Sequence, residues 1–125
     1  MAVKRKTIPA AAWCALVALA GLAASPNDER AAALALYREG RFADSVPLFD
    51  AVLERRPNDL EARIKRGNAY LRVNRPSKAL ADFEHVIQRD PANTSGHADL
   101  AVALLMLGRL DEAEAAFVRA IRLWD

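Results

Sequence analysis

Residues 60–93 read LEARIKRGNAYLRVNRPSKALADFEHVIQRDPAN, and this stretch predicts two short helices joined by a turn. Apolar side chains recur every three or four positions in 60–73 and again in 77–89, which is the spacing of amphipathic helices. Between them, Asn74 is a residue type that accepts the left-handed conformation that closes a helix. Pro76 fits the first turn of the next helix, and Pro91 prevents that helix from continuing. The stretch therefore predicts a helix–turn–helix unit.

The same unit occurs three times with a period of 34 residues, so that the repeats cover about 26–59, 60–93 and 94–125. The positions that superpose are Ala33, Gly67 and Ala101; Leu36, Tyr70 and Leu104; Gly40, Asn74 and Gly108; Ser45, Ala79 and Ala113; Phe49, Phe83 and Phe117; and Pro57 with Pro91. Hydrophobic residues make up 53% of the chain but aromatic ones only 6%. Such a composition favours helices that pack through small side chains, not strands. We expect an all-α fold, a short α-solenoid of three helical hairpins.

At these positions the chain resembles the tetratricopeptide repeat family. The resemblance covers about residues 26–125 and is closest in the second unit, which contains Gly67, Tyr70, Ala79, Phe83 and Pro91. The departures are Ser45, which stands in place of alanine, and three polar residues where the family commonly has Trp or Leu, namely Glu29, Arg63 and His97. They weaken single units and leave the resemblance intact.

The resemblance implies a superhelix in which the first helix of each unit lines a groove for a peptide or a partner helix. The implied lining residues are Arg30, Leu34, Tyr37 and Arg38 from the first unit, Ile64, Asn68, Leu71 and Arg72 from the second, and Ala98, Val102, Leu105 and Met106 from the third. The lining changes from polar and basic to apolar along the chain. It would complement an acidic or carbonyl-rich segment followed by an apolar one. The alternative for Arg38 and Arg72 is that they only complement helix dipoles at C-termini.

One subfamily clamps the C-terminal carboxylate of a chaperone with Lys, Asn and Arg side chains. The matching positions here are Arg30, Leu34, Lys65, Ser95 and Asp99. Leu34 lacks an amide, and Asp99 places a negative charge where the carboxylate would bind. We therefore do not expect this clamp.

The last predicted helix, about residues 110–123, has no following helix to cover it within the sequence. Phe117, Ile121 and Trp124 would then be partly bare, and exposed apolar patches tend to mark interaction sites. This favours a second function, self-association through this edge to give a homo-oligomer or an assembly subunit. The alternative is a frayed end or an incomplete chain.

Residues 1–24 have the pattern of an export signal. Lys4, Arg5 and Lys6 precede residues 8–24, which contain no charged side chain. A secretory signal peptide has this order of basic and apolar regions, and 17 residues is near the lower limit for a membrane-spanning helix. We expect cleavage and a periplasmic or secreted protein. The alternative is that the segment is not cleaved and anchors the protein in the inner membrane, with residues 25–125 outside the cytoplasm. The N-terminal segment would then be the only part of the protein in contact with the membrane.

The remaining chain excludes several functional classes. Without the three basic residues near its start, 15 basic residues face 16 acidic ones, which argues against nucleic acid as a partner. Cys14, the only cysteine, lies in the export segment, and His85 and His97 lie outside metal-ligand spacing. No phosphate-binding loop or nucleophile motif occurs. We expect no enzyme, no cofactor and no metal, with His85 facing solvent and His97 packed between helices. The expected partner is a protein or peptide.

Overall fold

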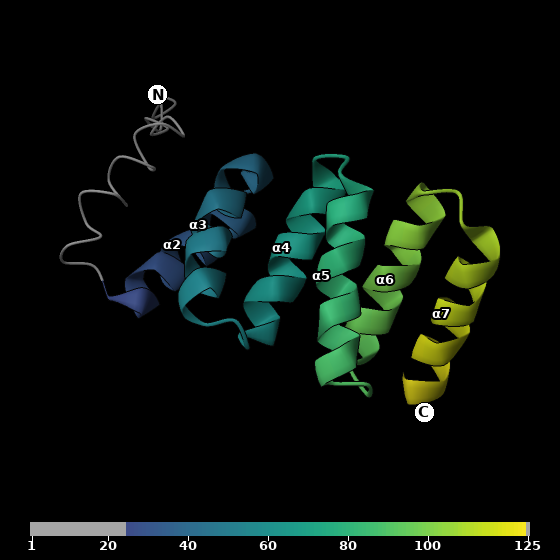
Figure 1. Cartoon of the computed structure of the whole chain (residues 1–125). Helices are drawn as coiled ribbons and strands as arrows, with labels where there is room; N and C mark the ends of the chain where they lie inside the picture. Colours follow the sequence, from purple (N-terminus) through teal and green to yellow (C-terminus); the bar gives the residue numbers. More distant parts are fainter. Residues whose placement is uncertain (1–24, 125) are drawn as a thin grey trace, which may run out of the picture.

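The computed structural model describes residues 25–124, and these residues form six helices in three hairpins. The helices are α2 (Pro26–Arg38), α3 (Phe42–Arg55), α4 (Leu60–Arg72), α5 (Pro76–Arg89), α6 (Thr94–Met106) and α7 (Leu110–Trp124). Figure 1 shows them side by side in chain order. The all-α solenoid predicted from the sequence is confirmed. The expected signal or anchor segment lies outside the described residues, and no described helix has the length and apolar character needed to cross a membrane.

Local sequence signals set the ends of these helices. Gly40, Asn74 and Gly108 follow α2, α4 and α6 with φ angles of 78°, 59° and 76°. Each adopts the left-handed conformation predicted from its residue type. The side chain of Asp59 accepts a hydrogen bond from the backbone N–H of Ala62 at 3.1 Å, and caps α4. Asn93 caps α6 in the same way. The turns therefore rest on contacts between near neighbours in the sequence.

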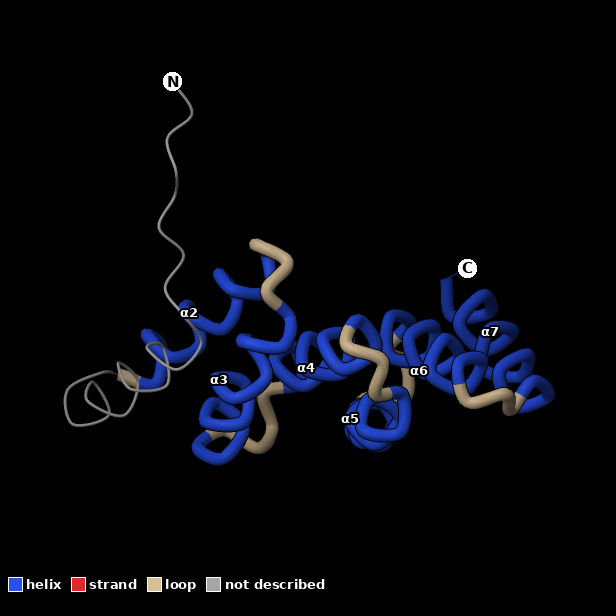
Figure 2. Tube along the Cα trace, turned by 90° about the horizontal axis from the view of Figure 1, so that it is seen from above, coloured by secondary structure: helices blue, strands red, loops and turns tan. Residues whose placement is uncertain are grey.

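The hairpins stack so that each helix packs against the next one in the chain. In addition, α2 contacts α4 and α4 contacts α6. Figure 2 shows α3 and α5 on one side of the row formed by α4 and α6. The row of α4 and α6 is therefore covered by α3 and α5 on one side and free of these two helices on the other.

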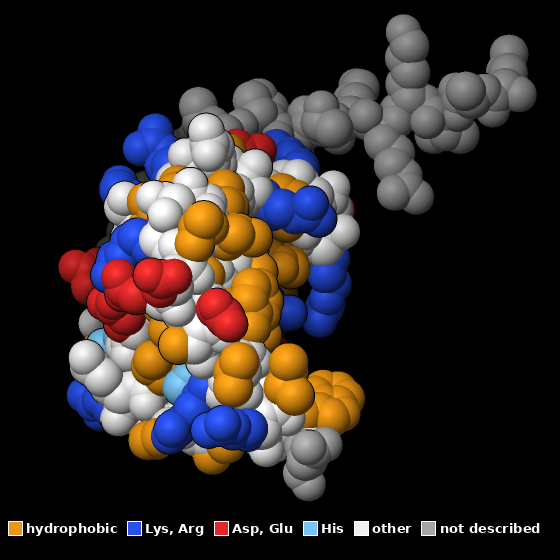
Figure 3. Space-filling model, turned by 90° about the vertical axis from the view of Figure 1, so that its right-hand side faces the viewer, with side chains coloured by type: hydrophobic (Ala, Val, Ile, Leu, Met, Phe, Trp, Pro, Cys, Tyr) orange, Lys and Arg blue, Asp and Glu red, His pale blue; other side chains and the backbone are white. Residues whose placement is uncertain are grey.

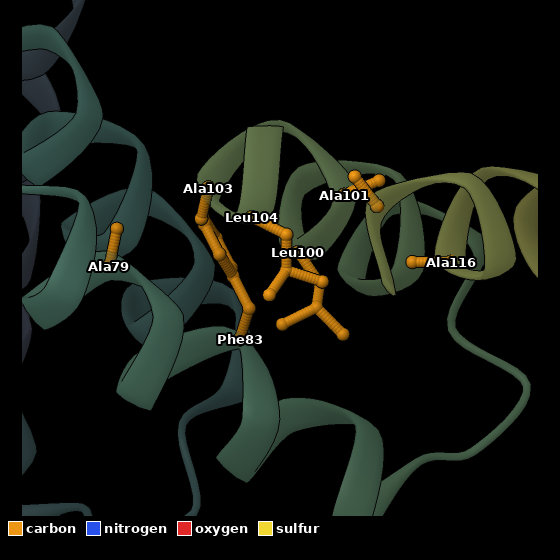
Figure 4. Packing of buried hydrophobic residues seen from close by; sticks show 8 residues of the cluster. Ala79, Phe83, Leu100, Ala101, Ala103, Leu104 and Ala116 are labelled. Carbon is orange, nitrogen blue, oxygen red and sulfur yellow. The ribbon is translucent and has the colours of Figure 1, made fainter. Parts of the chain in front are cut away.

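Two apolar clusters hold the hairpins together. One surrounds Phe49, and the other surrounds Phe83, which packs against Leu100 and Leu104 of the following hairpin (Figure 4). A methyl group on Gly67 would lie 2.6 Å from Cε1 of Phe83. Only glycine lets α4 approach this ring so closely, which explains the small residue that the repeat pattern requires there.

A buried ion pair joins the two helices of the second hairpin. Arg66 on α4 donates from Nε to Oδ2 of Asp82 on α5 at 2.9 Å, and from Nη2 to Oδ1 at 2.5 Å. Arg66 also reaches Asp50 of the first hairpin at 2.8 Å. Burial alone would lower the pKa of Arg66, but the bonds to Asp82 outweigh it and raise the pKa. One side chain thus connects α3, α4 and α5.

Glu29, Arg63 and His97, the polar residues at the position where the family commonly has Trp or Leu, each make a polar contact in the structure. Arg63 donates from Nη2 to the carbonyl oxygen of Pro57 at 3.0 Å, and His97 makes the equivalent bond from Nε2 to Pro91 at 2.8 Å. Both therefore tie the turn that precedes their own helix. Glu29 is buried and lies 3.4 Å from Arg55 of α3. The repeats thus replace an apolar contact with polar contacts to the turn or to the neighbouring helix.

The sequence-based prediction holds for one of the two histidines and fails for the other. His97 is buried between helices, as expected. The expectation that His85 faces solvent is wrong, because the side chain is half-buried and its Nε2 atom is shielded from water. Burial, and then the charges of Arg63 and Arg89, lower the pKa of His85. Residues 25–124 contain no group of three or more His, Cys, Asp or Glu side chains that could hold a metal ion.

Candidate protein-binding groove

The free face of α2, α4 and α6 contains a hollow of about 340 Å³. Its walls come from all three hairpins, which the 34-residue period places in register. The lining residues are Tyr37 of α2, Asn68, Leu71 and Arg72 of α4, and Asp99, Val102 and Met106 of α6. Six of these seven belong to the groove set predicted from the sequence. The structure therefore brings together residues that are up to 69 positions apart in the chain.

The other predicted groove residues lie beside the hollow or in contacts of their own. Leu34 packs on the cluster around Phe49, and Ile64 packs on the cluster around Phe83. Leu105 and Arg38 are exposed outside the lining, and Ala98 is half-buried there. These side chains support or flank the hollow and do not form its surface.

Arg30 does not reach the hollow, which corrects its assignment to the groove lining. Its Nε atom donates to Oδ2 of Asp59 at 2.8 Å, and its Nη2 atom donates to Oε2 of Glu61 at 2.6 Å. The hydrogen bond to Asp59, followed by the one to Glu61, raises the pKa of Arg30. The reason is that packing of α2 on α4 places two carboxylates from the start of α4 next to this guanidinium. Arg30 therefore fastens two helices and is already engaged.

Aromatic rings hold two cations beside the hollow. The ammonium of Lys65 lies 5.0 Å from the centroid of the Tyr37 ring. The guanidinium of Arg72 lies 5.1 Å from the ring of Phe42, at the start of α3. Such contacts stabilise a cation by about 0.5–1 kcal/mol at exposed sites. Arg72 is thus positioned by tertiary contact in addition to its favourable place at the end of α4.

Asp99 also lines the hollow, although it is not among the groove residues that the repeat resemblance implies. It precedes Val102 by three residues and Met106 by seven, so the helical spacing of α6 was the signal that could have revealed it. Burial raises the pKa of Asp99, while a hydrogen bond from Asn68 and the charge of Lys65 oppose this rise. A partly desolvated carboxylate is thus stabilised by an amide and by the charge of an ammonium group.

Because the pKa of Asp99 is raised in the folded protein, its ionisation costs folding free energy above that pKa. Below the ordinary aspartate pKa of 3.8, both states are protonated and the cost vanishes. We expect Asp99→Asn to raise the thermal unfolding midpoint at pH 7 and to lose this advantage near pH 3. Circular dichroism melts at the two pH values measure it. The variant Glu54→Gln on the exposed face of α3 controls for the loss of one acidic side chain. A lower midpoint of Asp99→Asn at pH 7 would contradict the assignment.

Comparison with known proteins agrees with this architecture. The model of the tetratricopeptide repeat family matches residues 30–72 and 64–125. The chain belongs to the tetratricopeptide repeat family. The first match extends from α2 to α4 and the second from α4 to α7, so the two matches overlap on α4.

Two longer proteins contain segments that are similar to this chain. SPINDLY of Arabidopsis thaliana, described as a probable UDP-N-acetylglucosamine–peptide N-acetylglucosaminyltransferase, is 30% identical over 95 residues, which are 76% of this chain and 10% of SPINDLY. MamA from Desulfovibrio magneticus RS-1 superposes with a TM-score of 0.76 at 27% identity, over 79% of this chain and 56% of that one. The chain thus spans about a tenth of the SPINDLY length.

A second similar structure contains a bound peptide. The second repeat domain of Spaghetti (RPAP3), bound to the HSP90 peptide SRMEEVD, has a TM-score of 0.74 at 20% identity. The match covers 78% of this chain and 91% of the Spaghetti chain. At this identity the likeness concerns the fold alone.

Proposed function

We propose that this repeat stack binds an extended peptide segment of a partner protein in the groove formed by α2, α4 and α6. One observation carries the proposal: six groove residues predicted from three separate repeats meet around a single hollow. Tetratricopeptide domains are protein-interaction modules, and the similar Spaghetti structure contains a peptide. These comparisons support a peptide as the class of ligand. The residue types expected in that peptide follow from the chemistry of the hollow.

The hollow offers different chemistry on α4 and on α6. Asn68 presents both an amide donor and a carbonyl acceptor, which can pair with the open backbone groups of an extended peptide. Arg72 adds a charged donor suited to a carboxylate or a carbonyl oxygen. Val102 and Met106 present apolar surface, and methionine adapts to side chains of different shapes. The expected ligand is therefore a polar or acidic residue followed along the peptide by an apolar one.

Asp99 sets a limit on this ligand. Its carboxylate lies in the hollow together with Asn68, so a terminal carboxylate placed there would meet a like charge. Arg30, the first position of the chaperone clamp, is bound to Asp59 and Glu61. The proposed ligand is thus an internal peptide segment whose acidic group lies near Arg72 and away from Asp99.

The test is selection of 12-residue peptides from a random displayed library on the immobilised protein, followed by fluorescence anisotropy. We expect the double variant Asn68→Ala/Arg72→Ala to weaken binding of the selected peptides by about 100-fold. This corresponds to loss of one neutral and one charged hydrogen bond, together about 3 kcal/mol. The matched control Asn58→Ala/Arg56→Ala removes the same residue types from the exposed turn before α4 and should leave binding unchanged. Peptides that bind both double variants equally well would place the site elsewhere.

A further inference from the structure

The outer face of α7 is apolar and has no neighbour among the described helices. Phe117 is 36% exposed, Ile121 is 65% exposed and Trp124 is 83% exposed. One repeat earlier, Phe83 is completely buried and Ile87 packs on the core, because α6 covers α5. Figure 3 shows this end of the molecule, where hydrophobic side chains lie between acidic and basic ones. Helix α7 thus presents the surface of an α5-type helix without its α6.

At the other end of the stack, α2 has the complementary surface. Ala69 of α4 and Ala103 of α6 are completely buried, whereas Ala35, the equivalent residue of α2, is exposed. Likewise Ala62 and Gly96 are buried, while their equivalent Asp28 is exposed. The difference arises because α3 packs on α4 and α5 packs on α6, but no described helix precedes α2.

The protein therefore makes the same type of interface twice, between α3 and α4 and between α5 and α6. Helix α7 has the surface of the first helix in such an interface, and α2 has the surface of the second. We propose that α7 of one copy packs on α2 of a second copy, which repeats the α5–α6 contact between chains. The stack of hairpins then continues from copy to copy. This contact does not involve the groove and is independent of the proposed peptide binding.

Charge complementarity supports this orientation. The four-residue connection at 90–93 makes α5 and α6 antiparallel, and α7 and α2 would be antiparallel in the same way. The acidic start of α7, with Asp111 and Glu114, then lies near Arg38 at the end of α2. The basic end of α7, with Arg122, lies near Asp28 at the start of α2. Opposite charges at both ends favour this register over the parallel one.

The size of the side chains favours α2 as the partner surface over a second α7. In the two existing contacts, Ala69 and Ala103 are completely buried, so the receiving helix has a small residue at this position. At the second position of the contact, α2 has Asp28 where α4 and α6 have Ala62 and Gly96. Helix α2 offers Ala35 in an exposed position, whereas the face of α7 consists of large side chains. A contact between two unlike surfaces leaves one free surface at each end of a pair, so rings or open chains longer than a dimer are expected.

The test is light scattering of the full 125-residue chain over a concentration series. We expect the mass to rise with concentration beyond twice the 13.7 kDa of one chain, without a plateau at the dimer. Ile121→Glu removes the α7 half of the contact, and Ala35→Arg removes the α2 half; both residues are exposed, so the fold should persist. Each variant alone should have the mass of one chain. An equimolar mixture of the two should form a pair with twice that mass, because one intact contact remains.

Several outcomes would overturn this arrangement. A wild-type chain with the mass of one copy at every concentration would exclude it. Dimers of Ala35→Arg alone would indicate contact between two α7 helices. Association that persists in the double variant Ile121→Glu/Ala35→Arg would arise elsewhere, residues 1–24 included. The groove variant Asn68→Ala/Arg72→Ala should assemble like the wild type, so loss of peptide binding and loss of assembly are separate results. Circular dichroism of every variant confirms that its helices are retained.

Discussion

Phe83→Ala is expected to lower the free energy of unfolding by about 3–5 kcal/mol, the range for removal of a buried aromatic side chain. Phe83 of α5 is completely buried and contacts its own hairpin and the next one. Its ring lies against Gly67 of α4, and it packs with Leu100 and Leu104 of α6. Because glycine cannot extend into the space left by the ring, the cavity cannot close locally. The loss should therefore lie at the upper end of this range.

Urea denaturation followed by circular dichroism measures this loss. Phe117→Ala is the matched control, since Phe117 holds the same position in the next repeat and is 36% exposed. It should cost clearly less, because part of its surface already contacts water. In a stack of repeats, unfolding can begin at one end, so the whole transition must be compared and not only its midpoint. Equal losses for the two variants would contradict the role of Phe83 as the contact between hairpins.

Asp82→Ala is expected to cost about 3 kcal/mol, because it leaves the guanidinium of Arg66 between helices without its main partner. Asp82 is only 2% exposed, and its carboxylate receives two hydrogen bonds from Arg66. The value should lie at the low end of the range for broken buried ion pairs, since Arg66 keeps its contact with Asp50.

The other repeats show how the same position can be filled without charges. The pair equivalent to Arg66 and Asp82 is Leu100 and Ala116 in the third hairpin. We therefore expect the double variant Arg66→Leu/Asp82→Ala to recover most of the stability lost in Asp82→Ala. Replacing a buried ion pair by apolar residues is often neutral or stabilising. Urea denaturation of both variants tests this, and a double variant less stable than Asp82→Ala would show that Arg66 stabilises the hairpin through its other contacts.

The sequence predicts those groove residues that occupy equivalent positions in successive repeats. Asn68 and Val102 are 34 residues apart, as are Arg72 and Met106, so equivalent helix faces had to lie on the same side of the stack. Asp99 is absent from the predicted lining, although its spacing from Val102 and Met106 places it on the same face of α6. Arg30 was assigned wrongly because a basic residue on a groove-facing helix resembles a ligand-binding group when its partners are unknown.

The sequence by itself determined the number, order and ends of the helices. These depend on contacts within a few residues, such as the caps at Asp59 and Asn93 and the left-handed turn at Asn74, and such contacts are encoded locally. Only the tertiary structure decided which polar groups pair. Arg30 binds Asp59 across 29 residues, and Arg66 binds Asp82 across 16. Those pairings depend on how far each helix is rotated about its axis, and this rotation is set by how side chains such as Phe83 pack against glycine and alanine on the neighbouring helices.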